Sequence, residues 1–260
     1  MADQDLVIEN HGQTRILTLN RPDERNPAST ALLFKLTEVA RDLQHDREVR
    51  AVIITGAGKA FSAGGDFKHF VATATDPSIA ATTIENGRAF VHAMLDLNVP
   101  VIAAVNGAAV GFGATLLALS DIVLMAENAF IAEPHANVGL VIGDGISVTW
   151  PFLMAMNKAK ELAFTGDRIY AAEAVACGLA NRVVAADALM CEALALAEKI
   201  SHQPRSAIAG SKQLLNMYSK AMLDTVLKQQ MELQFRQTQG DDHGRIVQSM
   251  IDAKTSDNGR

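Results

Sequence analysis

Two apolar segments that each run straight into a glycine-rich loop constrain the fold of this chain more than any other feature. The first loop lies within residues 59–68 (KAFSAGGDFK) and the second within residues 102–113 (IAAVNGAAVGFG). Short apolar runs that end at turn residues are typical of buried strands. Glycine lets the backbone approach a ligand closely because no side chain intervenes. Each segment therefore predicts a buried strand followed by a loop whose N–H groups can face a ligand, and two such loops can face one oxygen.

Strand and helix patterns alternate through the first part of the chain. The expected strands cover residues 6–9, 16–19, 49–55, 101–105, 122–126 and 130–131, and the expected helices cover residues 29–44 and 82–97. The first two strands are separated by Asn10-His-Gly12, which predicts an antiparallel hairpin. This alternation favours the α/β class, with a sheet whose strands are joined by helical crossovers.

The character of the sequence changes after about residue 155, where helix patterns dominate. Helices are expected over residues 157–164, 171–177, 186–200, 206–217 and 221–238, with a strand-like island at 180–184. We divide the chain into a core over residues 1–200 and a C-terminal helical region over residues 201–260.

Composition excludes several classes of partner. The chain has 260 residues, of which 49% are hydrophobic and 20% charged, as in ordinary globular enzymes. Its net charge of -6 and the lack of a block of like charges predict no nucleic-acid partner. The apolar stretch over residues 99–126 is broken by Asn106, by glycines and by Asp121, so we expect no membrane span there.

Cysteine usage and the N-terminus predict a cytoplasmic protein. Cys177 and Cys191 lie in alanine-rich surroundings typical of reduced core residues. The first residues, MADQD, have neither a basic region nor a following apolar core, as a secretory signal requires. The histidines and cysteines show no spacing typical of a zinc site, so we expect no metal.

The two loops resemble those of the crotonase (enoyl-CoA hydratase/isomerase) superfamily, and the resemblance extends from the segment LNRPDERN at 19–26 through TGDRI at 165–169 to the helical end. It implies a crotonase-like spiral of strand-strand-helix units and an acyl-CoA substrate in fatty acid metabolism. Coenzyme A then arrives as part of the substrate, with no further cofactor. It also implies a homotrimer or hexamer, in which the C-terminal helical region serves trimerisation.

In that superfamily one backbone N–H from each loop polarises the thioester carbonyl and stabilises an enolate. Lining up residues 62–66 with the alanine-glycine-alanine-aspartate pattern of the family places the first donor at Gly65, and lining up residues 111–113 with its triple glycine places the second at Phe112. The residues implied in substrate binding are Ala63, Gly65, Asp66, Phe67, Lys68 and Gly111.

A few cations are weaker candidates for contacts with coenzyme A. Arg21, Arg25 and Lys68 are candidates for its phosphates, and equally for solvated charges. Lys212 is a candidate for a place near a neighbouring subunit's ligand.

The chain departs from the hydratase pattern at the catalytic acids. Hydratases carry one glutamate after the triple glycine and another after a proline, where this chain has Thr115 and His135. Enoyl-CoA isomerases of the superfamily move a proton with a lone acid on the returning segment, which points to Asp144, with His135 orienting it. We therefore expect isomerase-like rather than hydratase chemistry. As an alternative, Asp144 between two glycines is also a good helix N-cap.

Two other functions stay open. Crotonase-fold hydrolases of β-diketones have a histidine at this spacing before glycine-aspartate-glycine and then Trp-Pro, matched here by Trp150-Pro151, but Phe112 stands where those enzymes would have another histidine. The chain is also compatible with a catalytically degenerate subunit that only binds acyl-CoA.

Overall fold

The computed structural model describes residues 5–143 and 145–257. Its main sheet has six strands in the order β1-β2-β3-β5-β7-β10. The strands are β1 (Leu6–His11), β2 (Thr14–Leu19), β3 (Ala51–Gly56), β5 (Val101–Val105), β7 (Ile122–Ala126) and β10 (Arg182–Val184). The first two form the predicted antiparallel hairpin, and every other neighbouring pair is parallel.

A second sheet of four strands has the order β4-β6-β8-β9. These strands are β4 (Ala60–Ser62), β6 (Ala108–Val110), β8 (Phe130–Ala132) and β9 (Ile169–Tyr170). Along the chain, β3 is followed by β4, β5 by β6 and β7 by β8, so each turn of the chain places one strand in each sheet before a helical segment follows. This repetition is the predicted spiral of strand-strand-helix units, and it confirms the expected α/β class.

Side-chain caps explain where the helices of the first half begin. In α2 (Thr30–His45), Ser29 accepts a hydrogen bond of 3.1 Å from the Leu32 N–H. Asp76 caps α4 (Pro77–Asp96), which therefore begins before the predicted residue 82. Asp66 caps α3 (Phe67–Thr75), a helix that the sequence did not predict.

The remaining helices of the core are short. They are η1 (Pro22–Glu24), α5 (Phe112–Ala118), η2 (Ala136–Val138), α6 (Ile146–Leu153), α7 (Met156–Thr165), α8 (Ala171–Cys177) and α9 (Leu189–Ser201). Gly178, with φ of +96°, ends α8 in the left-handed conformation that glycine favours.

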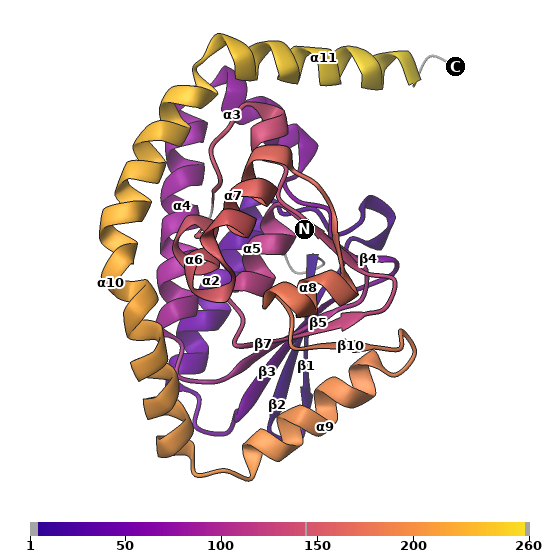
Figure 1. The fold of residues 1–260 in the computed structure, drawn as a ribbon, viewed down its shortest axis with the longest axis vertical. Coiled ribbons are helices and arrows are strands. Elements are labelled where there is room, and N and C mark those ends of the chain that lie inside the picture. Colours follow the sequence, from indigo (N-terminus) through magenta and orange to yellow (C-terminus); the bar gives the residue numbers. More distant parts are fainter. Residues whose placement is uncertain (1–4, 144, 258–260) are drawn as a thin grey trace.

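The C-terminal region differs from the prediction in two ways. Residues 205–238 form one continuous helix, α10 (Arg205–Thr238), rather than two, because neither glycine nor proline interrupts residues 211–238. A further helix, α11 (Asp241–Asp257), was not predicted. Figure 1 shows α10 along one side of the molecule, against α4 and α6, and α11 across one end. That the region serves trimerisation stays a prediction.

The core lies on both faces of the parallel strands. All residues of β3 and β5 are buried, as their uninterrupted apolar sequences predict for parallel strands covered on both sides.

Cys177 and Cys191 are both free thiols. Cys177 is half-buried, whereas Cys191 lies on an exposed face of α9. The expectation that Cys191 is a core residue is therefore wrong. None of the helices that the structure describes is long and apolar enough to cross a membrane.

Candidate active site

The two glycine-rich loops lie directly against each other. Gly64 and Gly111 both have positive φ angles, of +98° and +50°, which favour glycine. A Cβ atom on Gly64 would lie 3.2 Å from the Val110 carbonyl oxygen, and one on Gly111 would lie 3.8 Å from the Gly64 Cα. The loops can therefore approach each other this closely because both positions lack a side chain.

The predicted donor Gly65 follows this contact directly. Its neighbours pair with Ala28, because the Ala28 N–H donates to the Gly64 carbonyl at 2.7 Å and the Asp66 N–H donates to the Ala28 carbonyl at 3.0 Å. Since N–H groups alternate in direction along an extended chain, the Gly65 N–H points away from Ala28. It makes no hydrogen bond to any residue that the structure describes.

The second predicted donor, Phe112, is the first residue of α5. The N–H groups of the first turn of a helix have no partner within the helix. On either side, the Gly111 N–H donates to the Ala132 carbonyl and the Thr115 N–H donates to the Gly111 carbonyl. Within residues 5–143 and 145–257, the Phe112 N–H itself has no hydrogen-bond partner.

Both donor residues line one cavity of about 330 Å³. Of the residues predicted for the site, the cavity wall contains Ala63, Gly65, Asp66, Phe67, Gly111, Phe112 and His135. Lys68 is exposed and is not among the described residues that form the wall, so its predicted contact with substrate is not supported by the cavity.

Much of the cavity wall is apolar and suited to an acyl group. The ring of Phe112 lies 5.6 Å from that of Phe90. The other apolar side chains come from several helices and from the loop after β8, and they include Leu33, Phe70, Ile84, Val138, Leu140 and Met250. Helix α10 also contributes Gln234 and Thr238, so segments distant in the sequence share the cavity wall.

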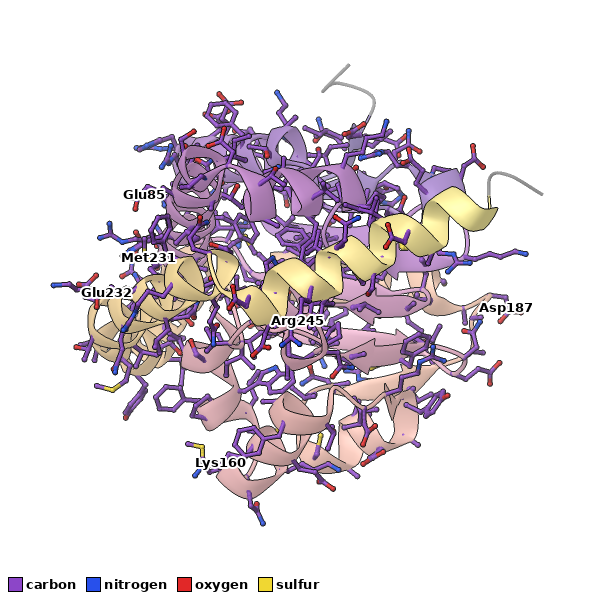
Figure 2. The ribbon with its side chains drawn as sticks, turned by 90° about the horizontal axis from the view of Figure 1, so that it is seen from above. Glu85, Lys160, Asp187, Met231, Glu232 and Arg245 are labelled. Atoms are coloured by element: carbon purple, nitrogen blue, oxygen red, sulfur yellow. The ribbon has the colours of Figure 1, made fainter. Side chains whose placement is uncertain are left out.

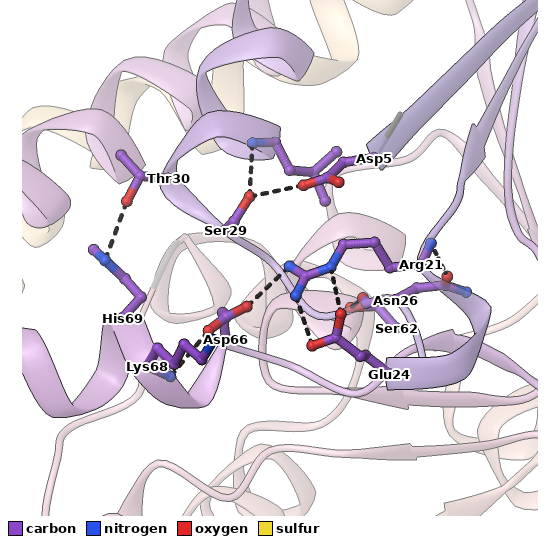
Figure 3. Close-up of polar contacts among 11 residues, drawn as sticks. Asp5, Arg21, Glu24, Asn26, Ser29, Thr30, Ser62, Asp66, Lys68 and His69 are labelled. Atoms are coloured by element: carbon purple, nitrogen blue, oxygen red, sulfur yellow. Dashed lines mark hydrogen bonds and ion pairs between the residues drawn. The ribbon is translucent and has the colours of Figure 1, made fainter. Parts of the chain in front are cut away.

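Asp66 is held by an ion pair at the mouth of the first loop (Figure 3). The Arg21 guanidinium lies 2.9 Å from the Asp66 carboxylate and 2.7 Å from that of Glu24. Burial alone would raise the pKa of Asp66, but the hydrogen bonds from Arg21 and the Lys68 N–H, with the charge of Arg21, lower it. Arg21 is therefore occupied by two carboxylates rather than free for a phosphate.

Asn26, which the sequence analysis did not select, holds the same loop in place through its side chain. Its side chain is buried, accepts a hydrogen bond from the Arg21 N–H at 2.8 Å and donates to the Ala60 carbonyl at 2.8 Å. Ser62 Oγ donates to the Asn26 carbonyl, also at 2.8 Å. With φ of +55°, Asn26 adopts a conformation that asparagine tolerates better than most residues.

His135 is paired with a buried carboxylate that the sequence analysis missed. Its Nδ1 forms a hydrogen bond with Oε1 of Glu133, a residue only 1% exposed. This contact holds the imidazole ring in one orientation at the cavity wall. The segment Glu133-Pro134-His135 at the end of a buried strand was the available signal.

The Nε2 side of His135 faces the loop before α6. A Cβ atom on Gly143 would lie 2.9 Å from His135 Nε2 and 3.3 Å from Gln234 Nε2. The residue that caps α6 is Gly145, with φ of +93°. Asp144, which the sequence predicts for proton transfer, lies outside the described residues.

Lys212 lies away from this cavity. Its Nζ donates to the Asp121 carboxylate at 2.6 Å and to the Val99 carbonyl at 2.9 Å. Burial lowers the pKa of Lys212, although Asp121 opposes this shift. That Lys212 lies near a neighbouring subunit's ligand stays a prediction; within its own chain the side chain is buried in an ion pair with Asp121.

Comparison with known proteins agrees with this arrangement. The sequence profile of the enoyl-CoA hydratase/isomerase family matches residues 10–252. A short-chain-enoyl-CoA hydratase of Clostridium acetobutylicum is 35% identical and is matched over 87% of each chain. The crystal structure of an enoyl-CoA hydratase/isomerase from Mycobacterium paratuberculosis is 42% identical, with a TM-score of 0.91 over 95% of this chain and 98% of that one.

A monofunctional enoyl CoA isomerase from M. smegmatis has the same fold with a lower score. It is 31% identical, with a TM-score of 0.70 over 85% of this chain and 94% of that one. Similarity therefore extends to relatives described as hydratases and to one described as an isomerase. The profile match over most of the chain and the shared architecture establish that this chain belongs to the enoyl-CoA hydratase/isomerase family.

Proposed function

We propose that the cavity binds the thioester of an acyl-CoA, with its carbonyl oxygen between the N–H groups of Gly65 and Phe112. The observation that carries this proposal is the presence of two unpaired N–H donors on adjoining loops in one cavity wall. Negative charge gathers on the carbonyl oxygen when a proton leaves C2. One such donor contributes about 2.7 to 4 kcal/mol to stabilising this charge.

The reaction that fits best is a shift of the double bond from a 3-enoyl-CoA to a 2-enoyl-CoA. One proton leaves C2 and one is added at C4, so a single acid-base group can serve both steps. Hydration also requires a positioned water. Thr115 and His135 stand where hydratases have glutamates, and Thr115 is fully buried and absent from the cavity wall.

Two residues are candidates for moving the proton. Asp144 stays predicted for this step from the family resemblance. His135 gains support from Glu133, because the buried side chain of Glu133 fixes the orientation of the ring at the cavity wall.

The direct test compares two substrates on the purified protein. We expect isomerisation of 3-hexenoyl-CoA to be much faster than hydration of crotonyl-CoA, with both followed by absorbance and product analysis. Efficient hydration without isomerisation would reverse this assignment. If hexanoyl-CoA fails to bind, the proposal of an acyl-CoA site is wrong.

The predicted assembly into a homotrimer or hexamer is supported by an exposed apolar surface. Side chains more than half exposed gather on the first half of α10 and on α6, and they are Leu214, Leu215, Met217, Tyr218 and Phe152. The rings of Phe152 and Tyr218 lie 6.4 Å apart. Burying such a surface against other copies is favourable, and sedimentation velocity measures the number of copies.

A further inference from the structure

We propose that Thr30, His69 and Thr83 form a subsite that binds a hydroxyl group on the acyl part of the substrate. This inference rests on the proposed function, because it assumes that the cavity holds an acyl-CoA. The three side chains come from α2, α3 and α4, and all three line the cavity that contains Gly65 and Phe112. They form a polar cluster within a largely apolar wall.

The hydrogen bonds of this cluster have a defined direction. Thr83 Oγ1 lies 2.8 Å from the Ile79 carbonyl oxygen and 2.8 Å from His69 Nε2. Because a carbonyl can only accept, the Thr83 hydroxyl donates its hydrogen to Ile79 and accepts one from His69 Nε2. The Thr30 hydroxyl lies 3.2 Å from His69 Nδ1 and 3.4 Å from Nε2 (Figure 3). Since the hydrogen on Nε2 is directed to Thr83, Nδ1 carries the lone pair to which Thr30 donates.

The direction of these bonds determines what the cluster can bind. The hydrogens of both hydroxyl groups and of the imidazole are already used in hydrogen bonds to protein atoms. The groups that remain for a ligand are therefore lone pairs on the hydroxyl oxygens of Thr30 and Thr83. Lone pairs bind a hydrogen-bond donor. A hydroxyl group supplies such a donor. A plain alkyl chain would cover these oxygens without replacing the hydrogen bonds that they accept from water.

Charge favours a neutral group over an acid. Burial lowers the pKa of His69, although the nearby charge of Asp66 opposes this shift, so the imidazole is uncharged at neutral pH. The cavity wall formed by the described residues contains Asp66 and has neither lysine nor arginine. A carboxylate on the acyl group would therefore lack a counterion on this wall.

The cluster is near enough to the proposed carbonyl site to contact the same ligand. Ala28 pairs with the segment around Gly65, and Thr30 follows Ala28 by two residues. Two residues span at most about 7 Å of chain. His69 lies in the first turn of the helix that Asp66 caps, directly after the first loop. A short acyl group bound at Gly65 is therefore within reach of the subsite.

Calorimetric binding tests this inference without turnover. The probes are hexanoyl-CoA and its 4-hydroxy, 5-hydroxy and 6-hydroxy derivatives, because these positions lie beyond the reacting carbons. We expect at least one derivative to bind about tenfold more tightly than hexanoyl-CoA. In Thr30→Val and Thr83→Val this preference should fall below about twofold, with hexanoyl-CoA bound at least as well as before.

Thr82→Val is the matched control. Thr82 is the exposed neighbour of Thr83 on α4, and its hydroxyl donates to the Ser78 carbonyl at 2.8 Å, in the same way as Thr83 donates to Ile79. Thr82 does not line the cavity. The control should therefore keep the full preference, which separates a loss of the subsite from a general change in α4.

The possible failures are distinguishable. If hexanoyl-CoA and all three derivatives bind equally well to the unmodified protein, the subsite is wrong and the acyl-CoA site stands. If the preference survives in both valine variants, the hydroxyl is bound elsewhere and the subsite is wrong. If no CoA ester binds, the proposed function fails and this inference fails with it.

Discussion

The imidazole of His135 is joined through Nδ1 to the carboxylate of Glu133, whose other oxygen is buried without a hydrogen-bond partner among the described residues. A buried carboxylate beside an imidazole favours the protonated ring and holds its orientation. Its effect on turnover should therefore depend on charge as well as on shape.

Glu133→Gln tests this charge. The amide oxygen of glutamine can still accept the hydrogen bond from Nδ1, but the negative charge is lost. We expect kcat for isomerisation to fall by about tenfold or more. Glu127→Gln, at an exposed position after β7, is the matched control. An unchanged kcat in Glu133→Gln would leave Glu133 with a packing role only.

Asp144→Asn and His135→Gln compare the two candidates for proton transfer. Each change removes a titrating group and keeps a hydrogen-bonding side chain of similar size. The predicted role of Asp144 requires a fall of about a hundredfold or more in kcat, with the larger loss in Asp144→Asn. Circular dichroism and thermal unfolding verify that the fold is kept. A larger loss in His135→Gln would transfer the main role to the pair with Glu133.

Gly65→Pro and Gly65→Ala separate the backbone donor from the space around it. Proline removes the N–H, so turnover should fall by about a hundredfold or more, which corresponds to the loss of one oxyanion donor. Alanine keeps the N–H, and its Cβ would have no atom within 4 Å, so Gly65→Ala should retain most activity. Steady-state kinetics on both folded variants is the measurement. Full activity in Gly65→Pro would mean that the carbonyl is bound elsewhere.

His69 should make stability depend on pH in the acid range. Its pKa in the folded protein is lowered by burial, so the unfolded chain binds more protons once the pH falls below the ordinary value of about 6.5. Stability contributed by neutral His69 is thus complete above this pH and is lost as the pH falls. We expect the free energy of unfolding to decrease less between pH 7 and 5 in His69→Gln than in the unmodified protein, as measured by urea denaturation. Equal decreases would contradict a buried, neutral His69.

Sequence patterns predicted the parts of the fold that depend on local apolar runs. The strands at 101–105 and 122–126 match the structure residue for residue, because each run is bounded by turn residues and buried on both faces. Helix α3 was missed although Phe67, Phe70, Val71 and Ala74 follow a helical spacing, because it is short and begins at a cap on Asp66 that had been considered only for substrate binding.

The site likewise contains residues that the local sequence indicates and residues that only the folded chain brings together. Both glycine-rich loops were visible because glycine is required where the backbones approach each other. Glu133 escaped notice because comparison with hydratases drew attention to the position of His135 alone. The cluster of Thr30, His69 and Thr83 is formed by three helices, and no spacing along the chain indicates such a contact.

The two C-terminal helices bring the last described part of the chain next to cavity residues from its first thirty positions. Figure 2 shows α11 lying across the molecule, and Met250 on this helix shares the cavity wall with Ser29 and Thr30. During synthesis the glycine-rich loops leave the ribosome long before Met250 does. A nascent chain can therefore fold its sheets early, but its acyl pocket lacks part of its wall until α11 has been made and has docked.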